Sequence, residues 1–322
     1  MGAPSDPRLQ PTPDYGTLGP GSDLRSGRPI RPQASRGFTV IAVLAGALLA
    51  LPVLKIGSLQ EWWDRAGQFL VALSQPTPRT KSQASTRRVS SQDQSMQREA
   101  EAALEAAIAK SPDANERIAA EVDSWRGHIS FTPNLSARIT GALNSNDYQV
   151  RESAIDVDLA AYDVAKTPAS VDSVIRQAKS SNHANRIWAL WTLGLLGNRG
   201  IETDRAVETL VVHLHDPDPD VRRWAIEGLA LVGTDTTIAP LLKAFHDDPS
   251  PTVRERAACS LAQSGMLRPE QRRTAIPTIL AYTEDSSLDS ATRAWAFHAL
   301  RDITGENLPD NSTAWRDWNS HQ

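Results

Sequence analysis

Apolar residues in the C-terminal part of the chain recur at the spacing of an α-helix. Val171, Val174 and Ala178 lie along one stripe, and most positions between them are polar. A period near that of the helical turn predicts an amphipathic helix with one buried side. Three later segments carry the same pattern: Val207, Leu210, Val211 and Leu214; Ile238, Leu241, Leu242 and Phe245; Ile276, Ile279 and Leu280.

A second pattern alternates with these stripes. Its origin is an arginine, followed by alanine three places on, leucine seven places on and glycine eleven places on. Successive origins lie between 32 and 39 residues apart, a period typical of arrays of helix pairs. Arg151 begins a degenerate unit or a cap, which keeps Ala154 but has Asp158 and Tyr162 at the leucine and glycine places. The clearer units are Arg186 with Ala189, Leu193 and Gly197; Arg222 with Ala225, Leu229 and Gly233; Arg254 with Ala257, Leu261 and Gly265; and Arg293 with Ala296 and Leu300.

Each place in this pattern has a physical reason. Alanine lets neighbouring helices approach closely, and leucine continues the same buried stripe one turn later. Glycine supplies the left-handed residue that ends the helix. The acidic, proline-rich segments 216–220 and 247–251 are expected to stop one helix and cap the next. The pattern predicts an all-α fold, an α-solenoid of about four to five helix pairs.

The segments DPDPDVRRWAIEGLALVG (216–233) and DDPSPTVRERAACSLAQSG (247–265) resemble HEAT repeats, particularly the short form called phycobilisome-lyase-type HEAT-like repeats. The resemblance covers residues 140–305 and implies a bacterial protein with a solenoid fold. Members of this family are scaffolds, adaptors and a few lyase subunits, and no residue here can be assigned to lyase chemistry.

Helices are also expected on both sides of the repeats. Residues 98–139 begin with strong helix formers, continue with a helix over 113–126, and are assigned to the N-terminal helices of the solenoid. Residues 306–322 resemble the tryptophan-containing tail that closes many bacterial HEAT arrays. Trp315 and Trp318 are expected to cover the open end of the last repeat.

An apolar run occupies residues 38–54, with no charged residue before Lys55. It nearly spans a hydrocarbon core about 30 Å thick. Because the run is apolar on all sides, a transmembrane signal anchor over 38–56 is favoured over a buried soluble helix. A cleaved signal peptide is the closer alternative, but its leader would be shorter than residues 1–37.

The charges beside this span predict its orientation. Several arginines lie in the Pro/Arg-rich segment 1–37, which is expected to be a disordered cytoplasmic tail. A juxtamembrane segment and a Ser/Gln/Thr-rich linker, 57–97, then lead to a periplasmic solenoid at the bacterial inner membrane. Ala42, Gly46 and Ala50 share one face of the span, a spacing that lets two spans form a homodimer, although such residues are also common in single spans.

Composition narrows the possible chemistry. The net charge of −4 and the acidic turns leave no continuous basic stripe, so no nucleic-acid partner is expected. The single cysteine, Cys259, excludes an internal disulfide and a cysteine-based zinc site, and is expected to be a buried, inert thiol. His215 and His246 occupy the same place in successive repeats, too far apart for one metal ion if helices stand about 8–10 Å apart. No catalytic, metal-binding or cofactor-binding residue is assigned.

Candidate partner-binding residues lie on two features of the repeats. In HEAT arrays the polar side of the second helix of each unit lines the concave face, which predicts partner contacts for Glu208, His213 and Lys243. Three tryptophans also follow their origin arginines by two places; they either form an aromatic ladder for a partner or pack between repeats, and packing is favoured. These are Trp188, Trp224 and Trp295.

The most consistent function is a membrane-tethered scaffold or adaptor that binds an unknown protein or peptide. The alternative is an accessory subunit of a lyase or cofactor-transfer enzyme. A cluster of titratable residues in one pocket would favour the alternative, and a broad mixed surface would favour the scaffold.

Overall fold

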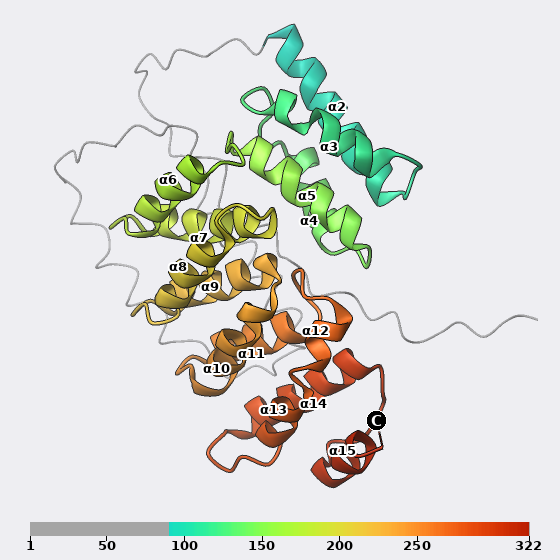
Figure 1. The fold of residues 1–322 in the computed structure, drawn as a ribbon, viewed down its shortest axis with the longest axis vertical. Helices are drawn as coiled ribbons and strands as arrows, with labels where there is room; N and C mark the ends of the chain where they lie inside the picture. Colours follow the sequence, from blue (N-terminus) through green and yellow to red (C-terminus); the bar gives the residue numbers. More distant parts are fainter. Residues whose placement is uncertain (1–89, 322) are drawn as a thin grey trace, which may run out of the picture. The chain divides into compact units, whose positions relative to one another are not determined.

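Two rows of helices form the part of the chain that the computed structural model describes, residues 90–321 (Figure 1). No strand occurs in these residues. The helices are α2 (Ser91–Ile108), α3 (Ala114–Trp125), α4 (Pro133–Leu143), α5 (Tyr148–Ala161), α6 (Pro168–Ala178), α7 (His183–Asn198), α8 (Thr203–His213), α9 (Pro219–Val232), α10 (Ile238–Asp247), α11 (Pro251–Ala262), α12 (Pro269–Arg273), α13 (Ile276–Tyr282), α14 (Ser290–Thr304) and α15 (Ser312–Asn319), with a 3₁₀ turn, η2 (Asp235–Thr237), before α10.

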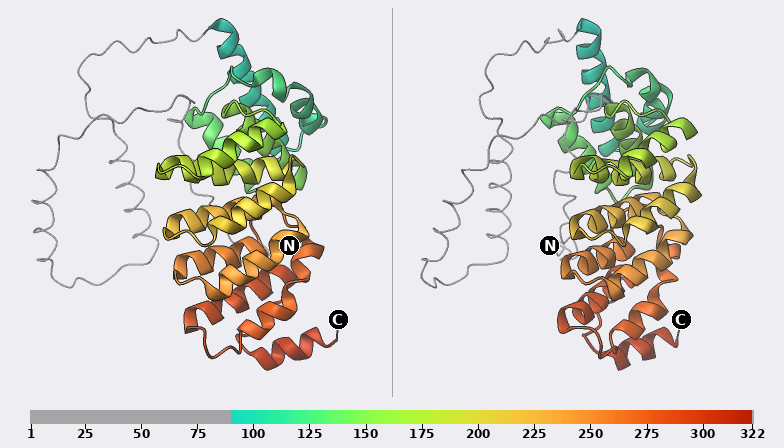
Figure 2. Two further views of the ribbon diagram at one scale, coloured as in Figure 1. Left: turned by 60° about the vertical axis from the view of Figure 1, so that its left-hand side comes forward. Right: turned by 90° about the vertical axis from the view of Figure 1, so that its left-hand side faces the viewer.

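The origin arginines begin one row, which we call the first helices: α5, α7, α9, α11 and α14. The second helices α6, α8, α10 and α13 form the other row, and each packs against the first helix that follows it (Figures 1 and 2). This alternation is the stacked arrangement of an α-solenoid. The all-α fold and the succession of helix pairs are confirmed for the described residues.

Membrane spans were predicted only in the N-terminal part of the chain. No helix in residues 90–321 is long and apolar enough to cross a bilayer. The tail 1–37, the span 38–56 with Ala42, Gly46 and Ala50, and residues 57–89 lie outside the described residues.

Local sequence signals explain where many helices begin. Asp218 is the N-cap of α9, its side chain accepts a hydrogen bond from the N–H of Asp220, and Pro219 takes the first helical position. At the start of α2, Ser90 and Asp93 form a capping box, so this helix begins at Ser91 rather than at Arg98. Residues 91–97, assigned to the linker from their composition, therefore belong to a helix.

The glycines at the eleventh place differ in their roles. Gly233 ends α9 with a φ of 65°, as predicted. Gly197, however, lies inside α7, and the left-handed residue after that helix is Gly200, with a φ of 77°. A Cβ atom at Gly197 would lie 2.9 Å from Cγ2 of Val232. Glycine is needed there because α9 approaches closely.

Helices α7 and α9 touch backbone to backbone at Gly194 and Gly228. A Cβ atom at Gly194 would lie 2.7 Å from the carbonyl oxygen of Gly228, and one at Gly228 would lie 2.6 Å from the carbonyl oxygen of Leu190. The first helices α7 and α9 are consequently in extensive contact, whereas the second helices α10 and α13 meet at only a few residues. The second helices are therefore packed less tightly against one another than the first helices.

Each origin arginine ties its helix to the turn before it. The guanidinium groups of Arg186, Arg222 and Arg254 donate to the carbonyl oxygen six residues upstream, at 3.1, 2.9 and 2.6 Å. Arg151 bonds the carbonyl of Ser145 in the same way. Buried carbonyl groups at the end of one helix thus receive their donors from the next helix.

The same arginines connect one unit to the following one. Arg222 pairs with both oxygens of Asp248, Nε to Oδ2 at 2.7 Å and Nη2 to Oδ1 at 2.9 Å. Arg254 pairs with Asp289 at 2.6 Å, and Arg186 approaches Asp216 at 3.9 Å. We call this series the arginine ladder. Its role was not anticipated from the repeat pattern, which gave reasons for alanine, leucine and glycine only.

A contact between distant parts of the chain joins α5 to the loop after α11. The hydroxyl of Tyr148 donates to the carbonyl of Leu267 at 2.8 Å, and the guanidinium of Arg268 lies 4.9 Å from the Tyr148 ring centroid. Arg151 also bonds the carbonyl of Gly265 in this loop. The degenerate unit that begins at Arg151 is therefore held against the loop that follows α11.

Helix α15 packs against the last helix pair of the described residues. Trp315 on α15 is buried, and its Nε1–H donates to the carbonyl of Pro309 at 3.0 Å. Its ring meets that of Trp318 edge to face, at a centroid distance of 5.9 Å. Helix α15 packs on α13 and covers the side of the last repeat that no further unit would bury.

Close approach of α7 and α9 makes Gly194→Ala a sharp test of this packing. The added methyl group meets backbone atoms of Gly228, which cannot move aside as a side chain would. We expect residues 90–322, produced on their own, to lose about 1–3 kcal/mol of unfolding free energy in urea titrations. The matched control is Gly141→Ala in α4, where a Cβ atom meets nothing within 4 Å and stability should stay equal or rise by up to about 1 kcal/mol. Equal stability of Gly194→Ala and wild type would contradict the close crossing.

Candidate functional site: a groove between second helices

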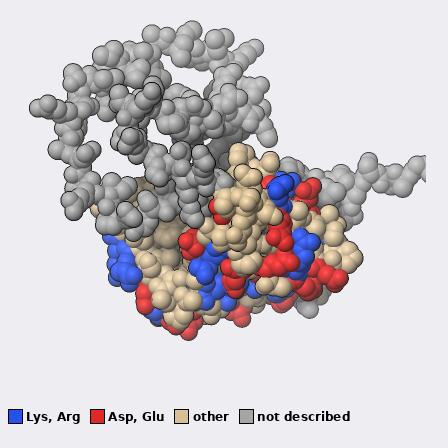
Figure 3. Space-filling model, turned by 90° about the horizontal axis from the view of Figure 1, so that it is seen from above, with Lys and Arg blue, Asp and Glu red and all other residues tan. Residues whose placement is uncertain are grey.

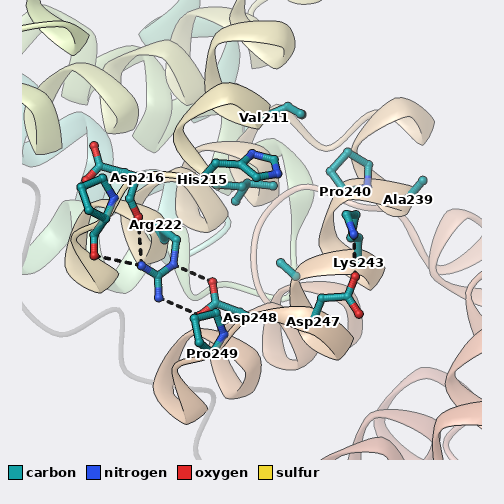
Figure 4. A pocket seen from close by; sticks show the side chains of 13 residues that line it. Val211, His215, Asp216, Arg222, Ala239, Pro240, Lys243, Asp247, Asp248 and Pro249 are labelled. Atoms are coloured by element: carbon teal, nitrogen blue, oxygen red, sulfur yellow. Dashed lines mark hydrogen bonds and ion pairs between the residues drawn. The ribbon is translucent and has the colours of Figure 1, made fainter.

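A groove of about 710 Å³ lies between α8 and α10, where the second helices diverge (Figure 4). Its walls come from the C-terminal half of α8, from α10, and from the two proline-rich turns that follow these helices. The residues that line it, here called the groove, are Val211, Leu214, His215, Asp216, Pro217, Arg222, Ala239, Pro240, Lys243, Ala244, Asp247, Asp248 and Pro249.

Carbon atoms make most of the groove surface. Val211 and Leu214 face it from α8, and Ala239, Pro240 and Ala244 face it from α10. These residues stay partly uncovered because the closest contact between neighbouring units is made by the first helices. The groove is thus an apolar surface that the fold itself leaves open.

The floor of the groove is a rung of the arginine ladder. Arg222 holds Asp248 bidentately and also donates to the carbonyls of Asp216 and Pro217, at 2.9 and 3.3 Å. The hydrogen bond with Asp248 raises the pKa of Arg222 above its usual value. The charges of Arg222 and Asp248 satisfy one another, so neither is available to a ligand. Their contact instead fixes the distance between the two turns.

The rim carries the groups available to a ligand. Nζ of Lys243 lies 2.5 Å from Oδ2 of Asp247, and both side chains are about half or more exposed, at 67% and 48%. His215 is exposed, and its ring makes no hydrogen bond within residues 90–321. Within the same residues, no group of three or more His, Cys, Asp and Glu side chains is arranged to hold a metal ion.

The predicted partner-binding residues of the second helices divide three ways. Lys243 lies on the groove, and Glu208 is exposed on α8. His213 is buried, with Nδ1 2.8 Å from the carbonyl oxygen of Thr209 and Nε2 3.0 Å from that of Ala178. Its predicted partner role is therefore wrong: the ring bridges α8 to the end of α6.

The tryptophans follow the packing interpretation. Trp224 is buried and meets Trp191 edge to face, at a centroid distance of 5.8 Å. Trp188 meets Tyr162 in the same manner at 6.0 Å, and Trp295 is half-buried against the hydrophobic core. Aromatic pairs of this geometry stabilise contacts between repeats. A continuous exposed ladder is not formed by these three residues.

Asp158 is a buried acid that the repeat pattern marked only as a departure from leucine. Nε1–H of Trp191 donates to its Oδ2 at 2.9 Å, and Oδ1 has no partner. Burial raises the pKa of Asp158 to about 7, against the lowering effect of the Trp191 hydrogen bond. The group lies in the packed junction of α5 and α7, away from the groove.

Charged residues elsewhere are mixed rather than segregated by sign. On the face shown in Figure 3, basic and acidic side chains alternate over the described helices. Cys259 is half-buried instead of fully buried, and burial raises the pKa of its thiol. The thiol therefore stays protonated near neutral pH, as expected for an unreactive cysteine.

Comparison with known proteins agrees with the fold. Residues 176–262, which run from the end of α6 through α11 and include both walls of the groove, match the family model of HEAT repeats. None of the curated proteins compared with the chain matches it. Among solved structures, a crystal structure of an engineered protein from the Northeast Structural Genomics Consortium is similar at 15% identity, over 64% of this chain and 97% of its own, with a TM-score of 0.32.

The buried Asp158 predicts a pH dependence of stability. Between the usual pKa of 3.8 and the raised value of about 7, the folded protein keeps a proton that the unfolded chain has lost. The unfolding free energy therefore falls as pH rises through this window, by an amount on the order of a few kcal/mol. Asp158→Asn removes the titrating proton but leaves an acceptor for Trp191. In urea titrations at pH 5, 6 and 8, the unfolding free energy of this variant should not fall with pH in this way. At pH 8 it should be higher than that of wild type.

The exposed acid Asp204 on α8 provides the matched control. Asp204→Asn should keep the pH slope of wild type. A slope in Asp158→Asn as steep as that of wild type would show that other groups cause it.

Proposed function

We propose that the HEAT repeats of this protein form a protein-interaction scaffold and that the groove between α8 and α10 holds a segment of the partner. The observation that carries this proposal is the open apolar groove itself, which lies within the residues that match the family model. Repeat proteins of the solenoid type use such surfaces to bind proteins and peptides.

Size and lining favour an anchored side chain. A groove of about 710 Å³ falls in the range of specific binding pockets, roughly 300–1,000 Å³. Its apolar walls gain by being covered, since about 25 cal/mol is obtained for each Å² removed from water. A bulky apolar side chain of the partner fits this surface.

The rim then supplies orientation. Lys243 and Asp247 offer a donor and an acceptor on α10, and His215 offers a free ring on the opposite wall. Polar groups around an apolar centre select the direction of a bound segment more than they add affinity. The partner segment is expected to place a polar backbone or side-chain group beside each wall.

Ala239→Arg tests this function. Ala239 is exposed on the wall of the groove, so the long charged side chain should fill the groove without entering the core. A photoreactive residue at position 217, an exposed position that lines the groove, serves as the probe. We expect proteins cross-linked from this position to be lost in the Ala239→Arg variant by at least about tenfold, which is a change of about 1.4 kcal/mol. Mass spectrometry of material from detergent extracts identifies the partner.

The matched control is Ala120→Arg, which adds the same side chain at an exposed position in the middle of α3. Cross-links should persist in this variant. Cross-links that are equal in Ala239→Arg and wild type would refute the groove as the binding site.

The membrane tether stays part of the proposal because it rests on the sequence of residues 38–54 and the arginines before them. The homodimer through Ala42, Gly46 and Ala50 and the alternative role as an accessory subunit of a lyase or cofactor-transfer enzyme stay predictions from the sequence.

Protease added to intact spheroplasts tests the tether and its direction. With the N-terminus in the cytoplasm, the helical region should be digested and the tail 1–37 should be spared, as read with epitope tags at each end. A helical region that resists protease until the membrane is permeabilised would reverse the orientation, and release of the protein by alkaline carbonate would exclude a spanning anchor.

A further inference from the structure

His246 lies between two carboxylates that belong to neighbouring units. It occupies the last turn of α10, and its side chain is 26% exposed. Nδ1 is 2.5 Å from Oδ1 of Asp247 on the same helix, and Nε2 is 2.9 Å from Oδ2 of Asp285 in the turn after α13. The ring also packs on Tyr282 of α13, with centroids 4.8 Å apart. Each ring nitrogen therefore faces an acceptor.

Only the charged imidazolium satisfies both contacts. A neutral imidazole has one N–H, so it donates to one carboxylate and turns a lone pair towards the other. The hydrogen bond to Asp285 raises the pKa of His246 above its usual value. Protonation of this ring decides whether it donates to both carboxylates or to only one, and the contact with Asp285 is the one that joins α10 to the turn after α13.

The other titratable groups around the ring keep a constant charge near neutral pH. Hydrogen bonds from Ser287 and then His246 lower the pKa of Asp285 to about 2. Lys243 first, and then His246, lowers the pKa of Asp247. Burial raises the pKa of Tyr282 to about 12, so its hydroxyl stays neutral and donates to the carbonyl of Leu242. His246 is the group of this set that changes charge.

Asp247 connects the ring to the groove. Its Oδ1 faces His246, and its Oδ2 holds Lys243 on the groove rim. Lys243, Asp247, His246 and Asp285 thus form a row of alternating charges from the groove to the next unit. The remaining contacts between α10 and α13 centre on Tyr282, whose ring packs on His246 and Phe245 and whose hydroxyl donates to the carbonyl of Leu242.

We infer that His246 is a pH-sensitive clamp between the second helices α10 and α13 and that it regulates the groove through Asp247 and Lys243. The regulatory part rests on the proposed function of the groove. When the ring is protonated, the clamp holds α10 and the groove rim in the observed arrangement. When the ring loses its proton, its charge attraction to Asp285 is lost and a lone pair faces one of the two carboxylates. Helix α10 then loosens from the turn after α13, and the groove binds its partner less tightly.

Hydrogen–deuterium exchange of the full chain in detergent measures the clamp without a partner. After correction for the intrinsic pH dependence of amide exchange, protection of the α10 amides should fall several-fold between pH 5.5 and pH 8. His246→Gln, which cannot carry a charge, should show the low protection at both pH values. Protection of α10 that is the same at both pH values in wild type, or a fall in His246→Gln as large as that in wild type, would overturn the clamp.

His215→Gln is the matched control, since His215 takes the same place in the preceding unit but its ring makes no hydrogen bond within the described residues. It should keep the pH dependence of wild type. Asp285→Asn provides a second test: an amide can accept from or donate to the neutral ring, so the His246 ring signal in NMR should titrate lower than in wild type. A wild-type ring that titrates at or below the usual value of about 6.5 would also overturn the clamp.

Repeating the position-217 cross-linking at pH 6 and pH 8 separates the two proposals. Cross-linking that falls at pH 8 in wild type, but is low at both pH values in His246→Gln, supports regulation. Groove-dependent cross-linking that is equal at both pH values overturns regulation and leaves the groove function standing. If α10 protection depends on pH and on His246, but cross-linking is unaffected by Ala239→Arg, the groove function is overturned and the clamp stands.

Discussion

The arginine ladder is the interaction on which the rest of this structure depends. A buried guanidinium group is tolerated only when its donors find acceptors, and here they find the open carbonyls of the preceding turn and a carboxylate of the next unit. One side chain therefore fixes both the entry into its own helix and the distance to the following repeat. Arg222 does this at the floor of the groove, where it sets the spacing of the turns after α8 and α10.

Unequal packing of the two rows turns this regular array into a binding surface. Gly194 and Gly228 let α7 and α9 meet backbone to backbone, and α8 and α10 splay apart as a result. The apolar side chains of the second helices remain partly uncovered, which is the origin of the groove. Function is thus tied to a packing asymmetry rather than to any cluster of reactive groups.

The charged residues at the floor of the groove are buried, whereas those at its rim are more exposed. Arg222 and Asp248 are buried and mutually satisfied, so they hold the floor at any pH near neutrality. At the rim, Asp247 contacts both Lys243 and His246, and His246 reaches the next unit. The histidine is the member of this set that titrates. A rigid floor and an adjustable rim are compatible because Arg222 pairs with Asp248, whereas Asp247 pairs with Lys243 and His246.

The sequence by itself determined the local features of this protein. Helix periods, the proline-led starts such as Pro219, the left-handed end at Gly233 and the Trp315 cap depend on residues close in the chain, and all were predicted. The start of α2 was missed by composition, although its Ser90 and Asp93 capping box was present in the sequence.

Only the tertiary structure decided the groove, the burial of His213 under α6, the packing role of Gly197 and the contact of Tyr148 with Leu267. Each of these depends on the distance between helices that are far apart in sequence. That distance is set by side-chain volume and buried charge at the crossings, which a repeat period does not specify.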